Sequence, residues 1–525
     1  MAASSLRDFF VASATGQLIS RVISFTINVY FLRSIDPQIL GLVNVRLTLL
    51  YTTLLFLVRE PLRKTCLGEQ VKSIPLFVNH LWLAPLLCIG FSVPLIPIWF
   101  FSTSGSVPEA YADGYMLVIL SFVLSAFIEC LAEPFAVIAQ KSNETRVFVV
   151  AQSLLILLQR VAVLAIISVT DVSPLTAFCI AQVLASTVYL LYYLRHFWKL
   201  TKARSFTDAP IGIADFRGYF PSFRHGFDRS ILRRIGTFLL HSVFKQLLTD
   251  GSGYVMTFTN HIELTDQAVY DAIERLGSLV ARIILAPLEE SSYKHFSEVL
   301  KRDVPLNDQP KEKITGAVDT LKTLLRITTL ISSVIICFGF AYSRIAVGLY
   351  GGDLLASNRG GELLSLYLLY LFVMAVNGIT ECFSAATMSN SDIFHHMRFM
   401  LISAVGHLAL NIGLSSYFST SGFIAANALN MVVRICYSWS HIRRYLGYRI
   451  PHVLDLLPSV TTTTLLIFSL VVTNLSNLIF GSTAGLIHNG AHIAIGGVMF
   501  LVVSLNIYNS EVLFQQYATS IQHQD

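Results

Sequence analysis

The chain has 525 residues, of which 54% are hydrophobic and 13% are charged. Soluble domains carry about 25% charged residues, so this composition excludes an ordinary soluble protein. The net charge of +5 does not point to nucleic-acid binding, because the basic residues lie between hydrophobic segments and not on one soluble face. We therefore expect an all-α polytopic membrane protein, in which each span needs about 20 apolar residues.

Apolar segments alternate with polar breaks along the whole chain and predict about fourteen membrane-spanning helices. The first segment contains Gln17, Arg21 and Asn28 and has no short apolar core followed by a small-residue cleavage site. It is therefore expected to remain as the first span rather than to be removed as a signal peptide. The predicted spans begin near Asp8, Ile39, Pro75, Ala110, Arg146, Pro174, Ser230, Ala268, Thr320, Glu362, Met397, Gly422, Leu454 and Gly485.

Basic residues are concentrated in the even-numbered connections between the predicted spans. The richest connection covers residues 195–229, and a second covers residues 294–313. Connections on the other side, such as 101–108 and 419–422, contain no lysine or arginine. The positive-inside rule therefore predicts that the even-numbered connections and both chain termini are cytosolic.

The basic connection divides the predicted spans into two groups. Residues 1–198 hold spans one to six, residues 199–229 form a basic cytosolic linker, and residues 230–525 hold spans seven to fourteen. This is the layout of a transporter with two lobes around a central cavity, which is the fold that we expect.

Polar residues recur at helical spacing within several spans. In the first span, Gln17, Arg21 and Asn28 share one helix face. An ionisable group in mid-membrane costs from about 2.5 to more than 10 kcal/mol, so such groups face a bundle interior or an aqueous cavity. Comparable stripes are Arg234, His241 and Lys245; Asp271, Arg275, Ser278, Arg282 and Glu289; Asn377, Glu381 and Ser384; and Asn427, Asn430, Arg434 and Ser438.

Two interpretations of these stripes remain open. Polar side chains can hydrogen-bond across packed helices, which explains any single stripe equally well. For the whole set, one central, positively charged cavity is favoured, because acidic residues within the same spans are too few to balance the arginines. The planar fork of arginine pairs with two oxygens at once, so a phosphate or pyrophosphate group is the expected guest.

Glu129 and Glu133 lie one helical turn apart in the fourth predicted span. They could form a cation or proton site, or they could pair with arginines on neighbouring helices, which we favour. Glu263 and His261 follow the seventh span and either meet substrate at the mouth of the cavity or form a solvated loop pair.

The sequence offers little support for catalysis. It has no Gly-Lys pair and hence no P-loop, no His-Glu pair and hence no His-Glu-x-x-His zinc helix, and seven cysteines without a Cys-x-x-Cys pair. We therefore predict a transporter rather than an enzyme, with no catalytic residue, metal or cofactor.

Residues 43–51, with the sequence VNVRLTLLY, continue through Arg59, Glu60 and Arg63 to Cys66. This run resembles the signature of the eukaryotic Rft family, within the multidrug, oligosaccharidyl-lipid and polysaccharide exporter superfamily. The resemblance implies residence in the endoplasmic reticulum membrane and a role in N-glycosylation. It also implies translocation of dolichol-pyrophosphate oligosaccharide, with five mannoses and two N-acetylglucosamines, from the cytosolic to the luminal leaflet.

Together the two lines of argument predict a translocator in which arginines hold the pyrophosphate while the lipid tail stays among membrane lipids. The predicted pyrophosphate ligands are Arg21, Arg33, Arg59, Arg282 and Arg434, and the accessory positions are Gln17, Asn28, Arg46, Arg234, Lys245, Glu263, Arg275, Glu381 and Asn430.

Alternatives stay open for several of these roles. Arg33 and Arg59 lie near span ends, where snorkelling to the membrane interface is an equal explanation. Arg46 is alternatively a helix-packing residue. The whole protein is alternatively a scaffold that binds the same lipid and passes it to the glycosylation machinery. A cation-coupled exporter is disfavoured by the excess of arginine.

Overall fold

The structure is a computed structural model of the chain, and within its described residues every regular element is a helix. The predicted all-α fold is therefore confirmed. The chain forms two compact units, Met1–Ala268 and Val269–Asp525, which we call unit 1 and unit 2. The described residues are 23–68, 73–142, 144–203, 213, 215–222, 224, 226–259, 262–302, 304, 308–480 and 486–510.

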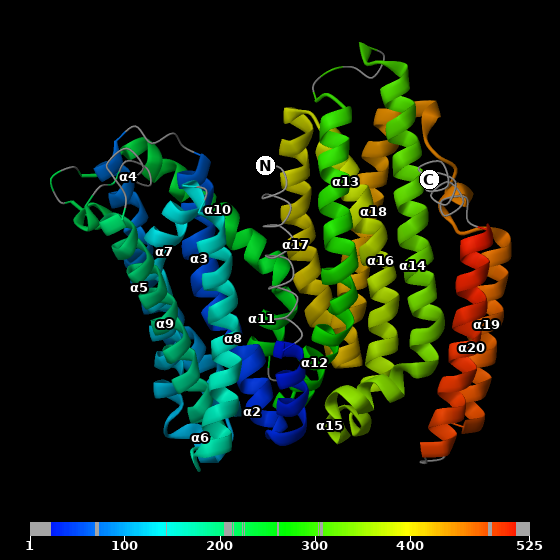
Figure 1. Cartoon of the computed structure of the whole chain (residues 1–525), viewed down its shortest axis with the longest axis horizontal. Helices are drawn as coiled ribbons and strands as arrows, with labels where there is room; N and C mark the ends of the chain where they lie inside the picture. The colour runs from blue at the N-terminus through cyan, green and yellow to red at the C-terminus, as the bar shows by residue number, and fades with distance from the viewer. Residues whose placement is uncertain are drawn as a thin grey trace. The chain divides into compact units, whose positions relative to one another are not determined.

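The helices of unit 1 are joined by short connections except between α9 and α10 (Figure 1). They are α2 (Pro37–Gly41), the π-helical turn η1 (Leu42–Leu47), α3 (Thr48–Gly68), α4 (Ile74–Leu81), α5 (Leu83–Thr103), the 3-10 turn η2 (Ser104–Ser106), α6 (Glu109–Ala112), α7 (Tyr115–Lys141), α8 (Thr145–Val169), α9 (Pro174–Ala203), η5 (Phe216–Tyr219), α10 (Arg229–Thr249) and α11 (Gly251–Phe258).

Helix α3 is the central helix of unit 1. It packs against α5, α7 and α10, while α9 packs against both α7 and α8. Prolines lie inside three of these helices, at Pro61 in α3, Pro94 and Pro97 in α5, and Pro134 in α7. Membrane helices tolerate such prolines because neighbouring helices and side-chain hydroxyls satisfy the backbone groups that proline leaves without a partner. Thr65, one turn after Pro61, donates its hydroxyl to the Pro61 carbonyl at 2.8 Å, which is the usual bond of a helical threonine to the carbonyl four residues earlier.

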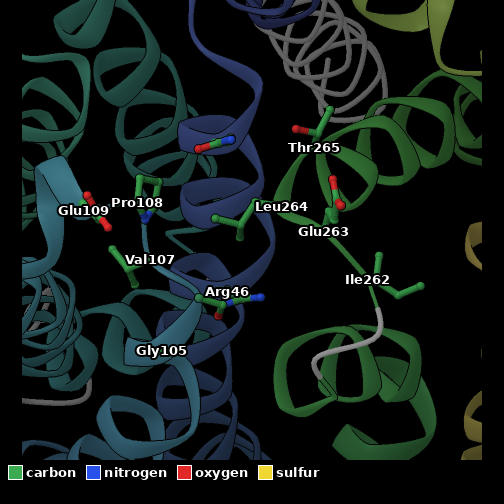
Figure 2. Close-up of a pocket in the computed structure, with 11 residues that line it drawn as sticks. Arg46, Gly105, Val107, Pro108, Glu109, Ile262, Glu263, Leu264 and Thr265 are labelled. Carbon is green, nitrogen blue, oxygen red and sulfur yellow. The ribbon is translucent and has the colours of Figure 1, made fainter.

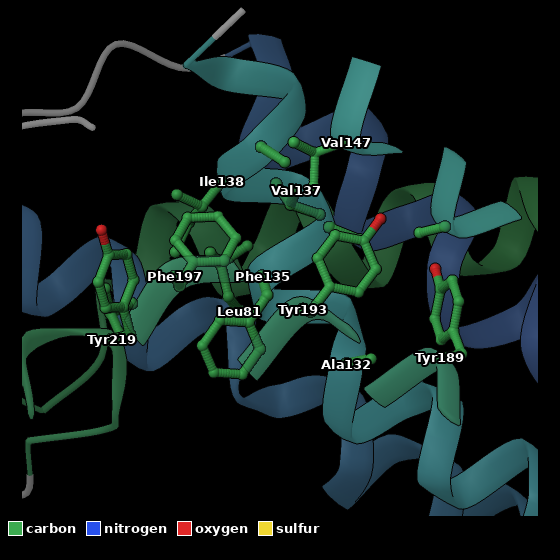
Figure 3. Packing of buried hydrophobic residues seen from close by; sticks show 14 of the residues in the cluster. Leu81, Ala132, Phe135, Val137, Ile138, Val147, Tyr189, Tyr193, Phe197 and Tyr219 are labelled. Atoms are coloured by element: carbon green, nitrogen blue, oxygen red, sulfur yellow. The ribbon is translucent and has the colours of Figure 1, made fainter. Parts of the chain in front are cut away.

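The basic connection between α9 and α10 is anchored to unit 1. Trp82 donates its indole N–H to the carbonyl of Tyr219 at 2.8 Å, and Asn79 exchanges hydrogen bonds with Ser222. The Tyr219 ring packs beside Phe197 of α9, inside the aromatic cluster of α4, α7 and α9 that Figure 3 shows. The described part of this connection is therefore a folded cap on unit 1.

Unit 2 contains three tightly connected helices, α14, α16 and α18. Helix α16 packs against α13, α14 and α18, helix α17 packs against α18, and the pair α19 and α20 packs against α14. The elements are α12 (Leu264–Val280, which begins in unit 1), the π-helical turn η6 (Ala281–Leu285), α13 (Ala286–Val299), α14 (Lys311–Gly351), α15 (Asp353–Ser357), α16 (Gly360–Thr387), α17 (Asn390–Phe418), α18 (Thr420–Leu446), η8 (Gly447–Arg449), η9 (Val453–Leu456), α19 (Val460–Phe480) and α20 (Leu486–Ser510).

Ten helical segments among the described residues are long and apolar enough to cross a membrane. The chain is therefore a multi-pass membrane protein, as predicted, although the number of about fourteen spans remains a prediction. Helices α10, α12 and α18 do not reach the apolarity of the ten. Polar stripes are predicted on all three of these helices. The polar and charged residues of the stripes are the reason that their mean hydropathy is lower.

The boundary between the compact units differs from the sequence-based division. Helix α10 belongs to unit 1 because it packs along α3. The prediction of lobes at 1–198 and 230–525, joined by the linker 199–229, concerns function and stays a prediction.

Candidate functional site

Two predicted positions, Gln17 and Arg21, lie outside the described residues. On the described part of the first helix, residues 23–34, Asn28 is buried and Arg33 is exposed. The other predicted positions fall into three groups: one on α3 and α10, one around loops of unit 1, and one in unit 2. Each group has different partners.

A ladder of ion pairs joins α3 to α7 in unit 1. Arg59 Nη2 lies 2.9 Å from Glu129 Oε2, and Arg59 Nε lies 3.0 Å from Glu133 Oε2. Arg63 contacts both oxygens of Glu133, at 2.5 Å from Nε and 2.8 Å from Nη2. Both glutamates are fully buried. Two guanidinium groups thus face two carboxylates, and the formal charges of the ladder cancel.

Hydroxyl groups saturate the Glu129 end of this ladder. Tyr51 donates to Glu129 Oε1, and Ser186 of α9 donates to the same oxygen at 2.9 Å. The interpretation that Glu129 and Glu133 pair with arginines of a neighbouring helix is therefore confirmed. A neutral, buried and hydrogen-bonded network of this kind holds helices together. Arg59 retains an exposed fraction of 15%.

Helix α10 carries the predicted positions Arg234 and Lys245, both of which are exposed. Lys245 Nζ lies 2.8 Å from Glu60 Oε1, and Lys64 Nζ lies 3.1 Å from the same oxygen. The Lys245 ammonium also lies 5.4 Å from the centre of the Phe56 ring. One half-buried carboxylate therefore links two lysines where α10 packs on α3.

Arg282 lies on the π-helical turn η6, between α12 and α13. Its side chain is exposed, and its Nη2 donates to Ser278 Oγ at 2.6 Å. Among the described residues, no carboxylate lies within ion-pair distance of Arg282. π-helical turns are rare and frequently occur at functional sites. Both π-helical turns of the described chain carry an arginine, Arg46 in η1 and Arg282 in η6.

Arg275 is compensated within its own helix. Its Nε lies 2.8 Å from both carboxylate oxygens of Asp271, one turn earlier in α12. The glycine that follows, Gly277, allows Tyr367 of α16 to approach α12 closely, because a Cβ at this position would overlap the tyrosine ring. The close contact between α12 and α16 places this ion pair beside the helix that carries Glu381.

Arg434 of α18 contacts Glu381 of α16, with 2.5 Å between Nη2 and Oε2. Asn377 donates to the same glutamate oxygen at 3.0 Å. The buried Nε of Arg434 has no hydrogen-bond partner among the described residues, and Nη1 reaches only the sulfur of Met431 at 3.8 Å. Thioether sulfur is a weak acceptor, so part of the Arg434 fork has no oxygen partner.

Asn430 belongs to a separate polar contact between α17 and α18. Ser403 donates to Asn430 Oδ1 at 2.7 Å, and one turn earlier His407 Nε2 lies 2.7 Å from Asn427 Oδ1. Asn430 is buried. In the predicted stripe of α18, Asn427 and Asn430 therefore contact α17, whereas Arg434 contacts α16.

Arg46 and Glu263 come together in unit 1. Both line a cavity of about 510 Å³ at the loops that precede α6 and α12. Arg46 is buried, with an exposed fraction of 1%, whereas Glu263 is exposed. Neither residue belongs to the α3–α7 ladder.

Comparison with known proteins places the chain in a family. The profile described as "Rft protein" matches residues 10–520, which is nearly the whole chain. The chain belongs to the Rft family. A Caenorhabditis elegans member, "Man(5)GlcNAc(2)-PP-dolichol translocation protein RFT1", is 40% identical over 99% of this chain and 100% of its own length. Members of the same name are 37% identical in Xenopus tropicalis, over 93% of this chain and 91% of the relative, and 35% identical in Mus musculus, over 92% and 90%.

Solved structures show that this Rft protein has an exporter fold. A structure described as "Lipid II flippase MurJ, inward closed conformation" aligns with a TM-score of 0.62 at 13% identity, over 96% of this chain and 100% of that one. An inward-facing multidrug resistance MATE transporter of the MOP superfamily aligns with a TM-score of 0.60 at 14% identity, over 82% and 96%. The predicted exporter-like fold is therefore confirmed.

Sequence reasoning missed the hydroxyl and amide partners in this Rft protein, such as Tyr51 and Ser186. One signal for the ion-pair ladder was present. Arg59 and Arg63 are spaced by four residues, as are Glu129 and Glu133, and two helices with matched spacing can align their charges in pairs. Single serines or tyrosines carry no such periodicity, so only packing reveals them.

Proposed function

We propose that this protein translocates a dolichol-pyrophosphate oligosaccharide, with five mannoses and two N-acetylglucosamines, from the cytosolic to the luminal leaflet of the endoplasmic reticulum. The observation that carries the proposal is 40% identity, over essentially the full length, to a relative named for translocation of Man(5)GlcNAc(2)-PP-dolichol. The likeness to a flippase structure supports a fold suited to moving lipids. The proposed role is therefore transport rather than catalysis.

Arg282 and Arg434 are the arginines best suited to hold the pyrophosphate. Arg282 is exposed and its one hydrogen-bond partner among the described residues is a serine hydroxyl. Arg434 keeps Nε and Nη1 without an oxygen acceptor in the described part of the chain. Phosphate oxygens accept from two N–H groups of one guanidinium, so they can fill these positions. Glu381, by holding Nη2, would orient the Arg434 fork.

The structure supports the other predicted ligands to different degrees. Arg21 and Arg33 remain predictions from the sequence. Arg59 pairs with Glu129 and also with Glu133, which it shares with Arg63, so we propose a supporting role in which its partly exposed edge contacts substrate. The accessory positions Gln17, Asn28, Arg46, Arg234, Lys245, Glu263, Arg275 and Asn430 remain predictions as well.

The proposed topology follows from the distribution of basic residues. Both termini and the 199–229 linker are proposed to be cytosolic, with the two groups of spans acting as the lobes of the translocator. Membrane lipids would surround the polyprenyl tail, and the glycosylation machinery would receive the luminal product.

A reconstituted leaflet-exchange assay tests the proposal. Purified protein in vesicles should accelerate transfer of the oligosaccharide lipid between leaflets, and the variant Arg282→Ala with Arg434→Ala should lose most of that acceleration. A matched control is Arg359→Ala, because Arg359 has a side-chain exposure of 78% and pairs with Glu362 on the surface. Tight binding of the lipid without any acceleration would overturn translocation and identify a scaffold that passes the lipid on.

A further inference from the structure

The cavity at the loops of unit 1 is formed by three segments that are distant in sequence. They are α2 with the turn η1 that carries Arg46, the turn between α5 and α6, and the start of α12 (Figure 2). All three lie in or next to odd-numbered connections, which the distribution of basic residues predicts to be non-cytosolic. The lining side chains with polar groups are Gln38, Arg46, Ser106, Glu109, Glu263 and Thr265.

Arg46 is held in place by its neighbours. Its Nε donates to Gln267 Oε1 at 3.2 Å, and its Nη1 donates to Ser106 Oγ. Gln267 is fully buried and donates in turn to the carbonyl groups of Met256 and Ile262, at 3.1 and 3.0 Å. This second layer of hydrogen bonds fixes the amide, so the Arg46 guanidinium has a fixed orientation.

Arg46 nevertheless has unused donors. It is 1% exposed, no carboxylate lies within ion-pair distance of it among the described residues, and Nη2 has no hydrogen-bond partner there. Figure 2 shows Arg46 between the segment of Gly105 and Val107 and the segment of Ile262 to Leu264. A buried guanidinium without its full set of partners is costly, so a ligand that accepts hydrogen bonds would stabilise it.

Hydrogen bonds and close backbone contacts also fix the segments that surround Arg46. Asp36 accepts from the backbone N–H of Gln38 at 2.8 Å and begins α2. Gly41 of α2 touches the backbone of Leu264, because a Cβ at this glycine would overlap the Leu264 carbonyl. Trp99 donates its indole N–H to the Arg46 carbonyl at 3.1 Å. The site is therefore a built feature of unit 1 rather than a gap between loose loops.

The charges of the lining residues select the class of ligand. One guanidinium and two carboxylates line the cavity, which gives a formal net charge of −1. A phosphate or pyrophosphate is disfavoured by the net negative charge, and a metal cation, although the two carboxylates attract it, would leave the unused donors of Arg46 without an acceptor. A neutral molecule with many hydroxyl groups is favoured, since each hydroxyl can donate to a carboxylate or accept from arginine, glutamine or a hydroxyl group.

We propose that this cavity binds the hydroxyl groups of a neutral oligosaccharide head group. The inference rests on the proposed function, because it assigns part of the same substrate to a second place on the chain. Its volume of about 510 Å³ lies within the usual range of small-ligand sites, about 300 to 1,000 Å³.

The test uses the full chain in nanodiscs and the free heptasaccharide of five mannoses and two N-acetylglucosamines, without lipid or phosphate. Titration calorimetry should show saturable binding. Glu109→Gln combined with Glu263→Gln should weaken it about tenfold, since the bonds lost are to charged groups. Both glutamates are exposed, so the variant is expected to fold. The matched control is Asp113→Asn, an exposed acid in the same connection that does not line the cavity.

Three results would overturn the inference. They are no binding of the heptasaccharide, equal binding by the glutamine variant, and displacement of the sugar by inorganic pyrophosphate, which would indicate an anion site. Leaflet exchange separates this inference from the proposed function. Leaflet exchange without binding of the heptasaccharide would support the proposed function and contradict the sugar site. Binding of the heptasaccharide without leaflet exchange would support the sugar site and contradict translocation.

Discussion

The arginines of α3 and those of unit 2 have different surroundings. Arg59 and Arg63 face the buried carboxylates of Glu129 and Glu133, so their charges cancel inside the helix bundle. Arg282 has a serine hydroxyl, and Arg434 has one carboxylate that it shares with an asparagine. An arginine that faces carboxylates on a packed helix is neutralised and joins the two helices. An arginine whose neighbouring helix supplies fewer carboxylates keeps hydrogen-bond donors for a ligand.

The largest effect on stability is expected at the buried ladder. Glu133→Ala removes a buried carboxylate that serves both Arg59 and Arg63, so two partly buried guanidinium groups lose a partner. Breaking a buried ion pair from one side costs about 3 to 5 kcal/mol. We expect a strong fall in protein abundance and in the thermal unfolding temperature of the purified protein.

A double variant separates charge from packing at the same position. Arg63→Ala with Glu133→Ala should be more stable than Glu133→Ala alone, because Arg59 keeps Glu129 and no second guanidinium is left without a carboxylate. If Glu133→Ala unfolds at the temperature of the unchanged protein, the ladder does not stabilise the bundle and the contrast with unit 2 disappears.

The opposite pattern is expected in unit 2. Arg282→Ala with Arg434→Ala should reduce leaflet exchange at least tenfold, because the lost hydrogen bonds to substrate are charge-assisted. Abundance should fall less than for Glu133→Ala, because the Glu381 that loses Arg434 is partly exposed and keeps Asn377. Replacement by lysine should rescue partly, since an ammonium keeps the charge and loses the planar fork. Addition of Arg21→Ala extends the test, and normal glycosylation in cells that carry only this triple variant would refute the arginine site.

The sequence predicted the membrane class and the family well, and the partners of the arginines less well. Long apolar segments and the run at residues 43–51 are local signals, so they can be identified without a structure. The charge argument compared arginines with acids in the same spans, yet the counterions of Arg59 come from α7. Which helix faces which is a property of packing, so the neutral ladder could only be proposed as one of two alternatives.

The partners of Arg46 could not be predicted from the sequence either. Its place near the start of the second predicted span left helix packing and an accessory binding role both open. The structure gives it a fixed amide partner and a cavity. The partner, Gln267, is separated from Arg46 by more than two hundred residues, and a single glutamine has no periodicity that would reveal it.

A smaller effect is expected where α13 meets α16. A Cβ at Gly378 would overlap the carboxylate of Glu289, so Gly378→Ala must displace that side chain. The atoms in the way belong to the end of a flexible glutamate side chain that can turn aside, so the loss should lie at the lower end of the about 1 to 3 kcal/mol that overpacking costs. Thermal unfolding should detect this loss. The matched control is Gly348→Ala in α14, where no atom lies within 4 Å of the added Cβ. Equal unfolding temperatures for the two variants would show that the helices adjust freely.

The smallest effect is expected at Glu60, which has the same arrangement of charge as Glu133 in a wetter place. One carboxylate again serves two cations, Lys64 and Lys245, but the exposed side-chain fractions are 21% for Glu60 and 36% and 46% for the lysines. Exposed ion pairs contribute about 0 to 1 kcal/mol and weaken as salt screens them. Glu60→Gln should therefore lower the unfolding free energy by less than about 1 kcal/mol, and by less still in high salt.

Comparison of Glu60→Gln with Glu133→Gln, measured in the same detergent at low and high salt, isolates the contribution of burial. Both changes replace a carboxylate by an amide of the same shape, and both leave two cations nearby. We expect the Glu133 variant to lose several times more stability, with little dependence on salt, since buried pairs are screened less than exposed ones. Equal losses that vanish together in high salt would mean that the α3–α7 ladder is hydrated, and its arginines would then be as available to pyrophosphate as Arg282 and Arg434.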